Sequence, residues 1–122
     1  MSNNADSLQF PYVQIRLRIA GQQAEIEIEE NAFLDTGFDG QVILPLSMLA
    51  QLGAPELTRD WTLADGSPAI SYSYSGVIEL AELPNQTRVT VDVIGSEVMI
   101  GRRLIEPLRV ILDHGREVIV EP

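Results

Sequence analysis

An aspartate stands at the end of the apolar run Ala32-Phe33-Leu34 and is followed by a hydroxyl residue and a glycine, as Asp35-Thr36-Gly37. A carboxylate at the end of a buried strand is costly unless it is hydrogen-bonded, paired or protonated. Thr36 supplies a hydroxyl, and Gly37 lets the backbone turn tightly and bring its N–H close to the carboxylate. Asp35 is therefore the residue in this chain best suited to acid–base chemistry.

The segment Phe33-Leu34-Asp35-Thr36-Gly37 resembles the hallmark of the retropepsin-like aspartic proteases, which is two hydrophobic residues followed by Asp-Thr/Ser-Gly. The tripeptide alone is a weak motif. Two further features follow in the family's order, a Leu44-Pro45 step into a short helix that ends at Gly53 and a late Val98-Met99-Ile100-Gly101-Arg102 segment before a second helix. The resemblance extends from about Val13 to Val120, which is nearly the whole chain.

The resemblance implies an aspartic endopeptidase that hydrolyses an extended peptide or protein substrate. Such hydrolysis needs two carboxyl groups sharing one proton, one to deprotonate the attacking water and one to donate to the carbonyl oxygen. The chain contains a single Asp-Thr-Gly. The resemblance therefore implies a homodimer, in which a two-fold axis brings Asp35 of each subunit together.

Supporting residues also follow from the resemblance, which places Thr36 and Gly37 beside the catalytic aspartate. Retropepsins commonly carry an aspartate four residues after the catalytic one, bonded to the arginine of the late Gly-Arg step, and here these residues are Asp39 and Arg102. Such a pair would tie the loop after Asp35 to the second helix. The alternative is two exposed charges that never meet.

A hairpin is predicted between residues 58 and 80, because Asp65-Gly66 is a strong turn signal between strand-like segments. A retropepsin needs a glycine-bearing flap that closes over its substrate. The resemblance assigns the tip of this flap to Leu63, Ala64, Asp65, Gly66 and Ser67. An ordinary surface hairpin would account for the same residues.

The chain departs from the family at two positions. Retroviral members usually have alanine where this chain has Phe38 and a further aspartate where it has Gly40. A bulky aromatic beside the active-site loop would narrow the cleft or pack against the partner subunit. Two alternatives therefore stay open: a catalytically inactive retropepsin-like domain that dimerises or binds peptides, and an unrelated β-barrel binding module in which Asp35 is a turn residue.

Composition excludes several other kinds of chemistry. The 122 residues contain no cysteine, no lysine and one histidine, so thiolate chemistry, Cys-ligated metals, Schiff bases and a P-loop are excluded. His114 lies in Asp113-His114-Gly115, a sequence typical of a turn. We expect neither a cofactor nor a metal. The net charge of −10 disfavours nucleic acid and anionic membranes as partners.

The hydrophobic pattern predicts one domain, residues 11–122, after a disordered polar tail at residues 1–10. The tail has neither the basic nor the apolar part of a signal peptide, so we expect a cytoplasmic protein. Strand-like segments occupy residues 13–19, 24–29, 32–35, 41–44, the hairpin 58–80, 88–94, 98–100, 110–112 and 118–120. The predicted fold is all-β: a small closed acid-protease (retropepsin-like) β-barrel with a flap hairpin and one or two short helices.

Overall fold

The structure is a computed structural model that describes residues 10–20, 24–81 and 83–122. Of the predicted tail at residues 1–10, only Phe10 is described. We also expect a turn at Gly21-Gln22, between the first two strand-like segments, and it lies outside the described residues. The elements, in chain order, are β1 (Tyr12–Ala20), β2 (Glu25–Asp35), β3 (Val42–Leu44), η1 (Leu46–Met48), α2 (Leu49–Leu52), β4 (Leu57–Thr62), β5 (Pro68–Leu80), β6 (Thr87–Val93), β7 (Met99–Gly101), α3 (Arg102–Ile105), β8 (Arg109–Asp113) and β9 (Glu117–Glu121).

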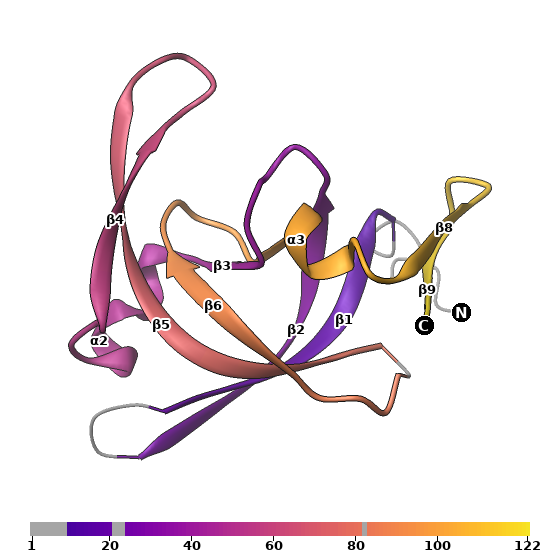
Figure 1. Cartoon of the computed structure of the whole chain (residues 1–122), viewed down its shortest axis with the longest axis horizontal. Coiled ribbons are helices and arrows are strands. Elements are labelled where there is room, and N and C mark those ends of the chain that lie inside the picture. The colour runs from indigo at the N-terminus through magenta and orange to yellow at the C-terminus, as the bar shows by residue number, and fades with distance from the viewer. Residues whose placement is uncertain (1–9, 21–23, 82) are drawn as a thin grey trace.

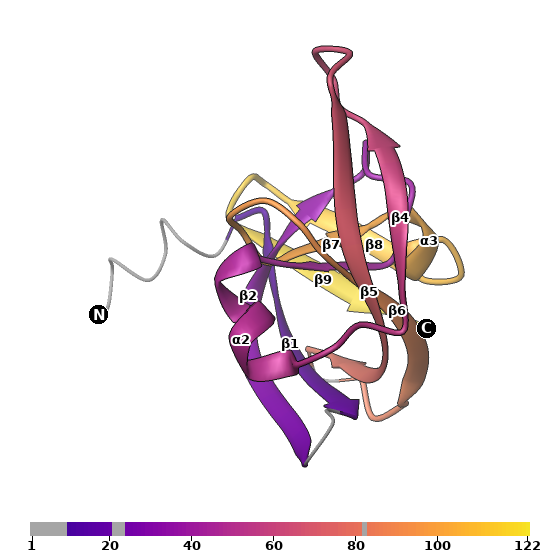
Figure 2. The ribbon, with the colours of Figure 1, turned by 90° about the vertical axis from the view of Figure 1, so that its left-hand side faces the viewer.

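Seven of these strands form one sheet in the order β1-β2-β7-β3-β6-β5-β4. A further antiparallel pairing joins β1 to β5, so six strands close into a barrel and β4 extends beyond it. The β4–β5 hairpin projects from the barrel in both views (Figures 1 and 2). The all-β prediction is confirmed, and so are the closed barrel and the short helices.

The interior of the barrel is filled by apolar side chains from every one of its strands. Alternating positions of β1 supply one wall, and the even-numbered residues of β2 face them across the pair. Fully buried members of this core include Ile15, Leu17, Ile19, Val42, Leu44, Ile78, Val91, Val93 and Ile100. Burial of this apolar surface is the main favourable term for folding, and it fixes the register of the strands, including those that end at the candidate site.

The prediction of separate strands at residues 24–29 and 32–35 is wrong, because β2 runs without interruption from Glu25 to Asp35. Glu30 caused the error. This exposed residue stands opposite Ile15, at a position where the alternation calls for an apolar side chain. No glycine or proline breaks the segment, and pairing with β1 continues past Glu30 as far as Phe33. Asp35 therefore ends a long, well-anchored strand.

The short helices lie where the sequence predicts them. Pro45 precedes η1, and α2 ends at Gly53, whose φ of 77° is readily adopted by glycine. The second predicted helix, α3, begins directly after Gly101, which is the last residue of β7. The last two strands, β8 and β9, form a separate two-stranded sheet at one side of the barrel (Figure 1).

Candidate active site

Asp35 is the last residue of β2, where it stands opposite Gly101 in the parallel pairing with β7. Its carboxylate oxygen Oδ1 accepts a hydrogen bond from the backbone N–H of Gly37 at 2.9 Å. A Cβ at Gly37 would lie only 3.2 Å from that same oxygen. The predicted contact between the Gly37 N–H and the carboxylate is therefore present, and glycine provides the close approach that it needs.

The order of the strands places the loop after Asp35 against the end of β7 and the start of α3. Strands β2 and β3 are consecutive in the chain, yet β7 lies between them in the sheet. The loop of residues 36–41, which joins β2 to β3, therefore passes the end of β7 and the start of α3. It accepts three backbone hydrogen bonds there, from Gly101 N–H to Gln41 O at 2.9 Å, from Arg102 N–H to Phe38 O at 2.9 Å and from Arg103 N–H to Gly40 O at 3.1 Å.

The predicted pair of Asp39 and Arg102 is formed. Arg102 Nη2 lies 2.7 Å from Asp39 Oδ1, and Arg103 Nε adds a second contact at 3.2 Å. The hydrogen bond from Arg102, helped by the charge of Arg103, lowers the pKa of the Asp39 carboxyl below its ordinary value. The pair is not buried, because the side chains of Arg102 and Asp39 are 52% and 54% exposed.

Phe38 packs over two glycines of its own chain. A Cβ added at Gly40 or at Gly101 would overlap the Phe38 ring. The two departures from the family pattern are thus linked, because a side chain at position 40 and an aromatic ring at position 38 would compete for one space. The ring also contacts Trp61 of β4, with ring centroids 5.6 Å apart.

The residues assigned to the flap form the tip of the β4–β5 hairpin. Leu63 N–H donates to Ser67 O, and Gly66 N–H donates to Leu63 O, each at 2.8 Å. Asp65 Oδ1 accepts the hydroxyl and the backbone N–H of Ser67, which lowers the pKa of the Asp65 carboxyl. The tip and the loop after Asp35 lie at the same end of the barrel (Figures 1 and 2). Trp61 and Phe38 connect the hairpin to that loop.

A polar cavity of about 600 Å³ lies between the hairpin, the loop of residues 36–41 and α3. Its lining carries both charges and consists of Asp39, Gly40, Gln41, Arg59, Trp61, Thr90, Asp92, Arg103 and Glu106. Asp35 does not line this cavity, and neither do the residues of the hairpin tip. Of the nine lining residues only Asp39 was predicted as a site residue, and the other eight, which include Arg59, Trp61 and Asp92, were missed.

These residues are hard to predict, because the hairpin reverses the usual pattern of burial. Ile70 of β5 is 55% exposed, whereas its neighbour Ser71 is fully buried. Asp92 lies between the core residues Val91 and Val93 and would be expected on a solvent-exposed face. The side chains of Arg59 and Trp61, from β4 at the edge of the same sheet, contact Asp92 and Ser71 on this face.

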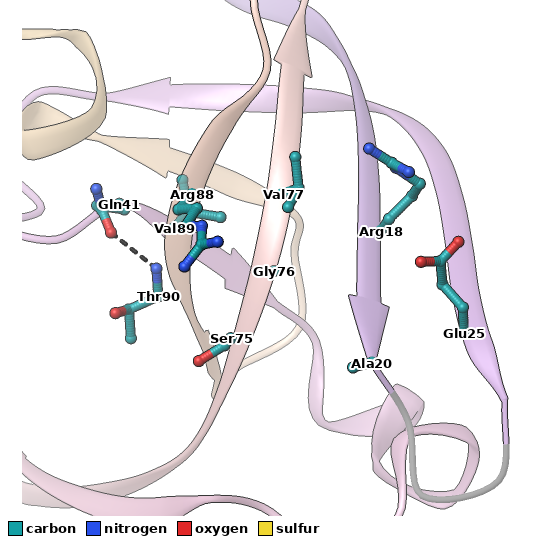
Figure 3. Close-up of a pocket in the computed structure, with 10 residues that line it drawn as sticks. All are labelled: Arg18, Ala20, Glu25, Gln41, Ser75, Gly76, Val77, Arg88, Val89 and Thr90. Carbon is teal, nitrogen blue, oxygen red and sulfur yellow. Dashed lines mark hydrogen bonds between the residues drawn. The ribbon is translucent and has the colours of Figure 1, made fainter.

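A second groove, of about 500 Å³, lies on the outside of β1, β5 and β6 (Figure 3). Gln41 reaches its edge from the active-site loop and accepts a hydrogen bond from the Thr90 N–H at 2.8 Å. Arg18 and Arg88 flank the groove. None of the predicted site residues lines this groove, although Gln41 and Thr90 line both the groove and the mixed-charge cavity.

His114 lies in the turn between β8 and β9, with a φ of 55°, and contacts Asp113 at 2.7 Å. Among the described residues, no group of three or more acidic or histidine side chains is placed to hold a metal ion. No helix in this part of the chain is long and apolar enough to cross a membrane. Comparison of the chain with protein-family models, with curated proteins and with solved structures found no match.

Proposed function

We propose that the protein is a retropepsin-like aspartic endopeptidase that acts as a homodimer. The observation that carries this proposal is the placement of Asp35 at the end of β2, in register with Gly101 and bonded by the Gly37 N–H. A carboxylate fixed in this way keeps one oxygen hydrogen-bonded to the backbone and its orientation set by the strand. Thr36 and Gly37 support it directly, and Asp39 and Arg102 hold the loop that follows.

The chemistry requires the Asp35 carboxyls of both subunits. Two carboxylates placed side by side share one proton, since like charges that close do not both ionise. The ionised member takes a proton from water, whose oxygen attacks the peptide carbonyl carbon, while the protonated member donates to the carbonyl oxygen. Transfer of a proton to the amide nitrogen then breaks the C–N bond and releases an acid and an amine.

The β4–β5 hairpin supplies the cover over the substrate. Its tip, Leu63 to Ser67, projects at the same end of the barrel as the loop after Asp35. The mixed-charge cavity lies beside that loop, so an extended peptide bound there would pass Asp39 and the base of the hairpin at Arg59 and Trp61. Closure of such a hairpin excludes water other than the nucleophile and strengthens the electrostatic interactions inside.

The decisive experiment is the change Asp35→Asn in the purified protein, assayed on a library of extended peptides across acidic and neutral pH. The amide matches the carboxyl in shape but does not exchange the proton, so we expect cleavage to be abolished and the fold to be kept. Wild-type activity should follow a bell-shaped pH profile with two macroscopic ionisations. Asp60→Asn, which changes an exposed carboxylate on β4, is the matched control and should remain active.

Cleavage that persists in Asp35→Asn would disprove this mechanism. A second candidate is a dimeric peptide-binding domain without catalysis, and the position of Phe38 between the Asp35 loop and Trp61 favours it, because the ring fills space beside the cleft. Peptide binding without turnover in the wild type would select this second function.

A further inference from the structure

A carboxylate is buried beneath the β4–β5 hairpin, outside the barrel core. Asp92 of β6 is 1% exposed and stands opposite Ser73 in the pairing with β5. Its Oδ1 accepts the hydroxyl hydrogens of Ser73 at 2.6 Å and Ser71 at 3.0 Å. Its Oδ2 lies 3.5 Å from Nη1 of Arg59. Burying a charge is costly unless it is paired and hydrogen-bonded, and these contacts meet that requirement.

Ser71 links this carboxylate to Trp61. The indole Nε1 lies 2.8 Å from Ser71 Oγ. An indole N–H donates only, and a hydroxyl has a single hydrogen to give. Ser71 must therefore accept from Trp61 and donate to Asp92, so the direction of the whole chain of hydrogen bonds is fixed.

Trp61 in turn connects to the loop of the candidate active site. Its ring packs against Phe38 at 5.6 Å with a tilt of 49°, and the Arg59 guanidinium lies 4.9 Å from the indole centroid. Phe38 follows Asp35 closely in the chain and fills the space above Gly101, the residue paired with Asp35. A continuous set of contacts thus joins Asp92 to the loop that carries Asp35.

We propose that Asp92 is a positioning residue, which acts through Ser71 to orient the Trp61 ring and thereby sets where the hairpin lies over the Asp35 loop. The hydrogen-bonded chain determines the plane of the indole, and the indole determines the contact with Phe38. The effect on catalysis rests on the proposed protease function. The effect on Trp61 itself does not.

Ser71 and Ser73 provide a matched test, because both donate to the same oxygen of Asp92 and only Ser71 contacts Trp61. Trp61 is the single tryptophan of the chain, so its fluorescence reports this position alone. We expect Ser71→Ala to shift the emission maximum and to increase quenching by acrylamide. Ser73→Ala should leave both unchanged, even where it lowers the melting temperature by the same amount.

Two substitutions of Asp92 extend the test. Asp92→Asn keeps an oxygen that can accept both hydroxyl hydrogens, so its emission should stay close to that of the wild type. Asp92→Ala removes the acceptor and should reproduce the shift of Ser71→Ala. Should Ser71→Ala fail to fold, the comparison of Asp92→Ala with Ser73→Ala decides, since only Asp92→Ala removes the acceptor that orients Ser71, and equal emission for these two variants would overturn the proposal.

Steady-state kinetics distinguish an effect on the position of the hairpin from an effect on the stability of the fold. A misplaced hairpin weakens binding of substrate and transition state alike, so Ser71→Ala should raise KM by about tenfold with kcat nearly unchanged. Ser73→Ala should leave KM as in the wild type. Equal emission and equal KM for Ser71→Ala and Ser73→Ala would overturn the proposal. A wild type that cleaves no peptide, together with the emission shift in Ser71→Ala, would refute the protease function and still support the positioning of Trp61.

Discussion

The ring of Phe38 occupies space that Gly40 and Gly101 leave open, and the two glycines differ in what surrounds them. The three atoms nearest to a Cβ at Gly40 all belong to the Phe38 ring. A Cβ at Gly101 would also meet backbone oxygens, Gly40 O at 2.6 Å and Phe38 O at 2.8 Å. A side chain can move away from a new Cβ, whereas this hydrogen-bonded backbone has little room to move.

Gly40→Ala should therefore destabilise the protein by about 1–3 kcal/mol through overcrowding, and adding Phe38→Ala should restore part of that loss. Gly101→Ala should be at least as destabilising, and Phe38→Ala should relieve a smaller share of the loss, because the clash with the two backbone oxygens remains. Denaturant unfolding of the single and double variants measures the coupling. Simple additivity of Gly40→Ala and Phe38→Ala would show that the ring does not occupy the space beside Gly40.

The ion pair between Asp39 and Arg102 predicts a pH dependence. Its hydrogen bond lowers the pKa of Asp39 from an ordinary value of 3.8. A lowered pKa means that the unfolded state binds the proton more tightly, so the stabilisation is present above pH 3.8 and is lost as the pH falls through the lowered value. Because both side chains are half-exposed, solvent screening keeps the effect small.

We expect the melting temperature of Arg102→Ala to be slightly lower than that of the wild type at neutral pH. This difference in melting temperature should disappear in strong acid, where Asp39 is protonated. Arg109→Ala is the control, because Arg109 is more exposed and its contact with Glu121 is longer, at 3.6 Å. At neutral pH, the difference in melting temperature between Arg109→Ala and the wild type should be smaller than that for Arg102→Ala. A difference for Arg102→Ala that is the same at every pH would show that Asp39 does not sense the arginine.

At the scale of elements, the hairpin tip depends on a left-handed glycine. Gly66 has a φ of 87°, and nothing lies within 4 Å of the Cβ it lacks. Alanine there costs about 1 kcal/mol in backbone strain without any clash. Gly115, in the β8–β9 turn, has a φ of 69° and equally open surroundings, so Gly115→Ala imposes a similar strain far from the candidate flap.

Gly66→Ala and Gly115→Ala should then lower the melting temperature by similar amounts, and only Gly66→Ala should raise KM for peptides. Steady-state kinetics and thermal melts on the same preparations make this comparison. Equal KM values for the two variants would mean that the tip does not touch the substrate.

Much of this arrangement is predictable from sequence, and the exceptions have physical causes. The end of β2 at Asp35, the hairpin turn and the partners Asp39 and Arg102 follow from local patterns and the family motif. The burial of Ser71 and Asp92 does not, because it involves the side chains of Arg59 and Trp61 from another strand, and local patterns carry no signal of that contact. The continuity of β2 was missed for a related reason, since pairing with β1 outweighs the polarity of Glu30.

At the scale of the whole molecule, each chain supplies only one Asp35 carboxyl, so the proposed pair of carboxyls requires two chains. The β8–β9 hairpin offers a surface for that contact. Ile111 and Ile119 are paired in register and half-exposed on one face, while Val118 and Val120 of the other face pack toward the core. Within the described residues, β9 pairs only with β8, so its outer edge has no strand partner.

We expect a dimer at micromolar concentration by sedimentation, and specific activity that falls on dilution as the dimer dissociates. Ile119→Lys should weaken association and reduce activity most at low concentration, with recovery at high concentration. Leu57→Lys, at an exposed position on β4, is the control and should leave association unchanged. A protein that sediments as a monomer even with a bound peptide analogue would refute the shared dyad.

The parallel pairing of β2 with β7 also governs when a newly made chain can form the candidate site. Asp35 leaves the ribosome well before Gly101, its neighbour in the sheet, because β3 to β6 are translated between them. Contacts between residues so distant in sequence form late, because the intervening chain must first be ordered. A nascent chain therefore carries Asp35 at first without the strand that fixes its position, and the carboxylate takes its place in the sheet only after β7 has been synthesised.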